Sequence, residues 1–178
     1  MKDTSVVLQN ICRQIELSDS AKKTVEREYT TLGNLIADSN LISYEVEVKP
    51  QGSYNLGTAI KPINGSDDDF DIDLVAVIFG EVNAREAKQC IGDVIKSSSL
   101  YSTKLQSEKH RAWTIQYQDS HVDLVPAIDG KESDILVTDK LDDGTYRFLP
   151  SSPFDFRDWF QKKGREIYQY SSTLENQK

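Results

Sequence analysis

Apolar residues recur every three or four positions in three stretches of the chain, a period typical of amphipathic helices. In the first stretch Val7, Ile11 and Ile15 share one face. The three predicted helices span residues 3–16, 20–37 and 83–97. A fourth helix is expected from Ser152, because a serine followed directly by proline is a typical N-cap and first helical position.

From Ser43 the period changes to two, which predicts β-strands. Residues 44–50 alternate apolar and charged side chains, as in a half-buried strand. Residues 70–79 begin acidic and continue apolar on both faces, as in a central strand that is covered on both sides. Further strands are predicted over residues 101–106, 111–118, 121–125, 135–137 and 146–148. Helices and strands in this order predict an α+β fold.

Composition and charge narrow the class of protein. The 178 residues include 21 Lys plus Arg and 29 Asp plus Glu, so the net charge is −8 and strong binding to duplex nucleic acid is not expected. The chain has no apolar stretch long enough for a membrane span and no secretory signal pattern, so a cytoplasmic protein without a membrane partner is expected. Cys12 and Cys90 both fall within helical stretches and are predicted to be reduced core thiols.

Three aspartates are the first candidates for chemistry. Asp71 and Asp73 are two apart on a predicted strand, so their carboxylates leave the same face. Like charges so placed repel, and a hard divalent cation relieves that repulsion. Asp123 lies in another apolar strand, and Asp69 shares the odd-numbered face and could replace one ligand. The alternative is that these are only a solvated strand entry and a turn residue.

Gly52 and Ser53 follow the strand that ends at Pro50. A Gly-Ser pair can bring backbone N–H groups and a hydroxyl close to a phosphate, although an ordinary turn has the same composition. The order of features is more specific than the pair. A strand, a Gly-Ser loop, a strand with alternating aspartates, a helix and a later strand with one aspartate follow each other along the chain.

In that order, Gly52-Ser53, Asp71-Ile72-Asp73 and Asp123 resemble the motifs of the nucleotidyltransferase superfamily of the DNA polymerase β type. Residues 51–62 and 121–127 look like the SMODS-type bacterial cyclic-oligonucleotide synthases, relatives of cyclic GMP-AMP synthase and oligoadenylate synthase. The resemblance implies a polymerase β-like palm with a mixed or antiparallel sheet flanked by helices. It further implies a helical segment over residues 1–42, a catalytic core over 43–150 and the start of a C-terminal helical region over 151–178, with the C-terminal helical domain largely absent from this chain.

The resemblance also implies roles for individual residues. The catalytic residues and Mg²⁺ ligands would be Asp71, Asp73 and Asp123, with Mn²⁺ as an alternative ion, and the nucleotide contacts would be Gln51, Gly52, Ser53 and Lys61. The implied reaction makes a cyclic di- or oligonucleotide from NTPs with release of pyrophosphate, as an antiphage signal, and an activating protein partner is conceivable. The alternatives are nucleotidyl transfer to an RNA or protein acceptor, and a truncated, non-catalytic nucleotide-binding module.

Four basic residues leave two interpretations open. His121 shares the face of Asp123 and is either a neighbour of the metal ligands or an ordinary packed or surface histidine. Lys104, Lys109 and Arg111 precede a predicted strand and form either a funnel for phosphates or a solvated face.

Overall fold

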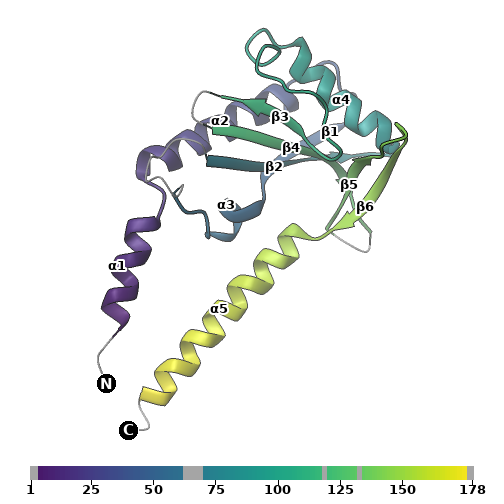
Figure 1. Ribbon diagram of the computed structural model, residues 1–178. Helices are drawn as coiled ribbons and strands as arrows, with labels where there is room; N and C mark the ends of the chain where they lie inside the picture. Colours follow the sequence, from purple (N-terminus) through teal and green to yellow (C-terminus); the bar gives the residue numbers. More distant parts are fainter. Residues whose placement is uncertain (1–3, 62–69, 118–119, 132–133, 176–178) are drawn as a thin grey trace.

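A mixed β-sheet lies at the centre of the structure, with helices on both of its faces (Figure 1). The computed structural model describes residues 4–61, 70–117, 120–131 and 134–175. In chain order the elements are α1 (Ser5–Ile15), α2 (Asp19–Ala37), β1 (Glu45–Pro50), α3 (Gly52–Leu56), β2 (Phe70–Phe79), α4 (Ala84–Ser97), β3 (Trp113–Gln116), β4 (Ser120–Asp129), β5 (Ile135–Lys140), β6 (Tyr146–Ser151) and α5 (Pro153–Glu175). Among the described helices, none combines the length and the apolar character that crossing a membrane requires.

The strand order within the described residues is β1-β2-β4-β5-β6, with β3 paired to β4 outside this path. Strands β2 and β4 run parallel, and all other neighbouring pairs are antiparallel. Strand β4 pairs with β3 up to Leu124 and with β5 from Ala127. Pro126, which has no backbone N–H to donate, lies at this change of partner. The predicted α+β class with a mixed sheet is therefore confirmed.

The two faces of the sheet bury different residues because side chains alternate along a strand. The even-numbered residues of β2, such as Ile72 and Leu74, are buried in the main core with α2 and α4. Val75 and Val77 belong to a smaller core on the opposite face, which also includes Phe154 at the start of α5. The odd-numbered Asp71 and Asp73 therefore share the face of the smaller core, away from α2 and α4.

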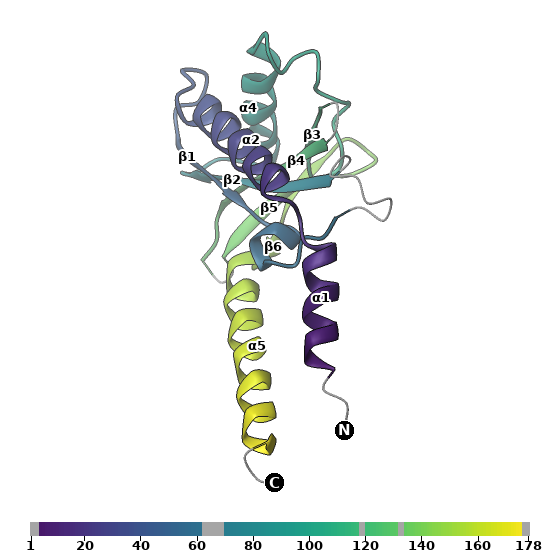
Figure 2. The same cartoon turned by 90° about the vertical axis from the view of Figure 1, so that its left-hand side faces the viewer.

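Helices α1 and α5 extend away from the sheet in the same direction in both views (Figures 1 and 2). The predicted first helix forms, but Val7, Ile11 and Ile15 are exposed by 58%, 47% and 42%, so its apolar face is not buried by the described residues. Cys12 lies on this helix and is exposed, so the predicted core position is wrong for it. Cys90 is half-buried, and burial raises the pKa of its thiol to about 11.

The first turn of α5 is capped by a residue distant in sequence. The backbone N–H groups of Phe154 and Asp155 both donate to Asp134 Oδ2, at 2.8 Å each. Ser152 stands before the helix as predicted, and its carbonyl accepts from the Phe156 N–H at 3.0 Å. The carboxylate of Asp134 therefore satisfies the orphan donors for which the sequence suggested the Ser152 side chain.

Two further segments differ from their predicted structure. Residues 101–106 are not a strand: the N–H groups of Lys104 and Leu105 return to Tyr101 O, and Leu105 makes only an isolated bridge. Tyr101 is buried in the hydrophobic core. The apolar residues of this segment therefore reflect the packing of an irregular turn against the core and not a β-strand. The predicted Gly-Ser loop instead forms the short helix α3.

Candidate functional site

The parallel pairing of β2 and β4 brings the predicted aspartates together. Asp73 is the direct register partner of Asp123, and Asp71 is the register partner of His121. Partners in a ladder project from the same face of a sheet, so these four side chains form one patch on the face away from α2 and α4. The patch arises because one odd-numbered face continues across two adjacent strands.

Helix α3 begins directly against this patch. The Gln51 N–H donates to Asp73 O at 2.8 Å, and Gln51 Nε2 donates to Leu74 O at 3.2 Å. Gly52 follows with a left-handed φ of 62°, and a Cβ at this position would overlap the Asp73 carboxylate. Glycine is therefore required twice here, once for the backbone conformation and once for the close approach.

Each outer aspartate is held by a basic residue of the chain. His121 Nε2 lies 3.2 Å from Asp71 Oδ1. Lys109 Nζ donates to both carboxylate oxygens of Asp123, at 3.2 and 3.3 Å. The buried hydroxyl of Thr114, the β3 partner of Asp123, also donates to Asp123 Oδ1.

Asp73, between the two, has no such cationic partner described. Burial raises the pKa of its carboxyl, and the neighbouring charges of Asp123 and Asp71 raise it further, with His121 acting in the opposite direction. A cation placed beside Asp73 would relieve this cost.

The donor set suits a hard divalent cation. Carboxylate oxygens are the ligands that Mg²⁺ takes in proteins together with water and phosphates, and Asp73 and Asp123 present them from adjacent strands. In the part of the chain that the structure describes, no three acidic, histidine or cysteine side chains are grouped so that together they could hold a metal ion. Such a cation would therefore need further ligands, which can be water molecules or, when a nucleotide is bound, phosphate oxygens.

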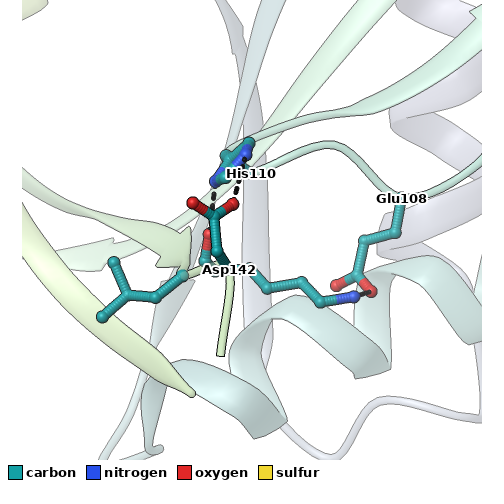
Figure 3. A pocket seen from close by; sticks show the side chains of 5 residues that line it. Glu108, His110 and Asp142 are labelled. Atoms are coloured by element: carbon teal, nitrogen blue, oxygen red, sulfur yellow. Dashed lines mark hydrogen bonds and ion pairs between the residues drawn. The ribbon is translucent and has the colours of Figure 1, made fainter. Parts of the chain in front are cut away.

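Both sequence neighbours of Lys109, Glu108 and His110, are hydrogen-bonded to Lys140. His110 Nδ1 donates to Lys140 O at 2.6 Å, and the Lys140 N–H donates back to His110 O at 2.8 Å. Glu108 Oε2 accepts from Lys140 Nζ at 2.6 Å. Figure 3 shows Glu108 and His110 on the wall of a pocket of about 220 Å³, which Lys140, Leu141 and Asp142 complete. These bonds anchor the backbone around Lys109 to β5.

The remaining predicted residues are placed less centrally. The Ser53 side chain is exposed, and its carbonyl accepts from the Thr58 N–H at 2.9 Å. The Lys61 N–H donates to Ile15 O at 2.7 Å, next to the bridge between Ile60 and Glu16. Asp69 lies outside the described residues.

The predicted basic group does not form one funnel. Lys104 lies over the Tyr117 ring at 4.5 Å from its centroid, and Arg111 pairs with Asp139 at 3.7 Å. Of Lys104, Lys109 and Arg111, only Lys109 has a described contact with one of the three aspartates. Thr114 was missed by sequence reasoning, and no local pattern marks it, because its importance comes from its register with Asp123.

Comparison with known proteins gives a family match over most of the chain. The family model described as the Second Messenger Oligonucleotide or Dinucleotide Synthetase domain matches residues 1–164. A c-di-GMP synthase of Roseivirga ehrenbergii is 26% identical over 158 residues, which cover 86% of this chain and 42% of that protein.

Solved structures show the same fold at low identity. The CD-NTase CdnG of Bradyrhizobium diazoefficiens, in complex with GTP, gives a TM-score of 0.67 at 21% identity over 82% of this chain and 43% of that one. The DncV cyclic AMP-GMP synthase of Vibrio cholerae, in complex with the linear intermediate 5′ pppA(3′,5′)pG, gives 0.71 at 13% identity over 88% and 59%. The chain thus spans about two fifths to three fifths of the length of these proteins.

These matches confirm the resemblance to the SMODS-type synthases. The family match includes the Gly-Ser segment, both aspartate-bearing strands and the first turns of α5. We conclude that the chain belongs to the family of Second Messenger Oligonucleotide or Dinucleotide Synthetase domains.

Proposed function

We propose that this chain carries the catalytic core of a nucleotidyltransferase that joins NTPs into a cyclic di- or oligonucleotide with release of pyrophosphate. The observation that carries the proposal is the direct register of Asp73 with Asp123, with the Gly52 backbone packed against the Asp73 carboxylate. Two carboxylates beside a backbone that can approach closely suit a metal-bound triphosphate. Family membership and the c-di-GMP synthase relative support the same reaction.

In the proposed reaction, a ribose hydroxyl oxygen of one nucleotide attacks the α-phosphorus of an NTP. A new P–O bond forms while the bond from the α-phosphorus to the oxygen bridging to the β-phosphate breaks, and pyrophosphate leaves with the electron pair. The proposed acceptor of the hydroxyl proton is Asp123, and its register with Asp73 on one face of the sheet supports this role. A second transfer of the same kind closes the ring.

The proposed ligands of the divalent cation are Asp71, Asp73 and Asp123, and the proposed nucleotide contacts are Gln51, Gly52, Ser53 and Lys61. Bound Mg²⁺ or Mn²⁺ would neutralise phosphate charge and lower the pKa of the attacking hydroxyl. Within the cell we propose a cytoplasmic signalling role in antiphage defence, with an activating protein partner. The resemblance to the family supports this proposed role, and no single contact among the described residues bears on it.

The reaction is tested by incubating the purified protein with NTPs labelled at the α-phosphate, together with Mg²⁺ or Mn²⁺. Phosphatase treatment and thin-layer chromatography then separate cyclic products, which resist the phosphatase. Asp73→Asn removes the charge at constant shape and should reduce product roughly 100-fold or more. Glu45→Gln, which neutralises an exposed carboxylate on β1, is the matched control and should leave the yield unchanged.

A phosphatase-resistant product that is lost in Asp73→Asn but kept in Glu45→Gln would support the proposal. Label appearing on protein or RNA would instead assign the site to transfer onto a macromolecular acceptor. Equal product from wild type and Asp73→Asn would overturn both enzymatic assignments.

A further inference from the structure

Lys109 contacts both carboxylate oxygens of Asp123, the atoms through which Asp123 would bind a divalent cation. Its ammonium group lies 3.2 Å from Oδ1 and 3.3 Å from Oδ2, so it covers both oxygens at once. The Thr114 hydroxyl already uses Oδ1 from the strand side. Few lone pairs of Asp123 therefore remain for another positive charge while Lys109 is in place.

The backbone of Lys109 is fixed, but its side chain has room to leave. The neighbours Glu108 and His110 are bound to Lys140, and the Lys109 N–H donates to Ala112 O at 3.2 Å. The Lys109 side chain is 46% exposed, whereas the Asp123 side chain is 27% exposed. A four-carbon stem on an anchored backbone can swing its ammonium into solvent without disturbing β3 or β4.

We propose that Lys109 is a displaceable counter-cation of Asp123. It positions the carboxylate together with Thr114, and it competes with the divalent cation for the same two oxygens. The inference rests on the proposed function only in so far as that function places a divalent cation at Asp123. Under this proposal the cation binds Asp123 as Lys109 is released, so the Lys109–Asp123 ion pair lowers the affinity of the site for metal.

The first test measures Mn²⁺ binding by calorimetry in the absence of nucleotide. Lys109→Met should bind Mn²⁺ about two- to fivefold more tightly than wild type, which is the range set by one partly exposed ion pair. Lys109→Arg keeps the charge and should retain the wild-type affinity. Lys104→Met removes a positive charge from the same segment between α4 and β3, where the described contact of Lys104 is with the Tyr117 ring. This variant should bind Mn²⁺ as tightly as wild type does.

The second test follows the ammonium itself by brief acetylation with an amine-reactive ester, read by mass spectrometry. Saturating Mn²⁺ should increase labelling of Lys109 relative to Lys104, at ionic strength matched with NaCl. In Asp123→Asn, labelling of Lys109 should be high already and insensitive to Mn²⁺.

An unchanged Mn²⁺ affinity in Lys109→Met, or labelling of Lys109 that does not respond to saturating Mn²⁺, would overturn the inference. Neither readout requires synthesis of a nucleotide product. Competition between Lys109 and Mn²⁺ in a protein that makes no cyclic product would leave the inference standing and overturn only the proposed function. Wild-type and Asp73→Asn proteins that bind Mn²⁺ equally would place the metal elsewhere and overturn both.

Discussion

Gly52 and Asp73 are packed so closely that no side chain fits between them. A Cβ built on Gly52 would lie 2.9 Å from Asp73 Cγ and 3.0 Å from Asp73 Cβ, and it would overlap Oδ2. The contact joins the start of α3 to β2, the strand that carries two of the three aspartates. It couples the position of the Gly-Ser segment to the position of the carboxylate.

Gly52→Ala should therefore abolish activity as well as reduce stability. The left-handed conformation costs a non-glycine residue about 1–2 kcal/mol, which lowers the Tm by about 2–8 °C in a chain of this size. Gly57→Ala is the matched control, because Gly57 has a φ of 71° but, among the described residues, no atom within 4 Å of a Cβ at this position. Gly52→Ala should melt at a lower temperature than Gly57→Ala, because its Cβ also overlaps the Asp73 carboxylate, and only Gly52→Ala should lose product in the labelled-NTP assay. Full activity in Gly52→Ala would show that the Asp73 carboxylate can move without consequence.

Thr114 should matter through the position of Asp123 and not through packing. Thr114→Val keeps the shape of a buried side chain but loses the hydroxyl that donates to Asp123 Oδ1. Groups that orient metal ligands typically contribute 10- to 100-fold to metal affinity or activity, so Mn²⁺ binding should weaken about tenfold or more. Thr114→Ser restores a donor and should recover most of that affinity. Equal Mn²⁺ binding by the valine and serine variants would argue against a positioning role.

The cap of α5 gives a prediction about stability that is independent of the site. Asp134→Ala removes the acceptor for two N–H groups in the first turn, which should cost about 0.5–2 kcal/mol of unfolding free energy. Asp134→Asn keeps an oxygen acceptor and should lose less. Hydrogen exchange should become faster at Phe154 and Asp155 in the alanine variant, with little change in α4. Equal hydrogen-exchange rates at Phe154 and Asp155 in the alanine and asparagine variants would contradict the capping role of Asp134.

The parts of the fold that sequence could predict are those in which local periodicity and burial agree. Residues 70–79 form β2 with the predicted bounds, because an apolar run that is buried on both faces has few other solutions. The predicted helix over residues 83–97 also forms, and Asn83 caps it as α4 by accepting from the Glu86 N–H at 2.9 Å. In both cases the sequence signals that set the bounds of the element lie within the element or within one turn of it.

The rest depended on contacts between distant segments. That Asp73 pairs with Asp123 is a matter of register between strands 50 positions apart, and only the family resemblance pointed to it. The Lys109 contact and the Asp134 cap come from irregular connections, which no periodicity describes. Residues 101–106 failed as a strand because Tyr101 is buried by the core of the whole domain and not by a pleated neighbour.

Lys88 on α4 is a charged residue that is buried by contacts with distant segments of the fold. It is completely buried on α4, and its described hydrogen bond is a long one of 3.5 Å to His110 O. Its ammonium also lies 5.6 Å from the centre of the Trp113 ring. Burial lowers the pKa of Lys88 to about 8, although the Glu108 carboxylate acts in the opposite direction.

The stability of the protein should therefore depend on Lys88 in alkaline solution. Its pKa is lower in the folded chain than in the unfolded chain, so between about pH 8 and pH 10.5 the unfolded chain binds more protons and the contribution of Lys88 to stability rises with pH. Below pH 8 the cost of burying the charge is fully present. At 1.36 kcal/mol per pKa unit it amounts to about 3 kcal/mol, so Lys88→Met should be more stable than wild type at pH 7 by up to that amount.

Urea unfolding at a series of pH values should show the stability advantage of Lys88→Met shrinking towards pH 10.5. Lys96→Met removes an exposed lysine near the same Trp113 ring and is the control. A difference between Lys88→Met and wild type that stays constant from pH 7 to pH 10.5 would mean that the pKa of Lys88 is the same in the folded and unfolded chains, and would contradict the prediction.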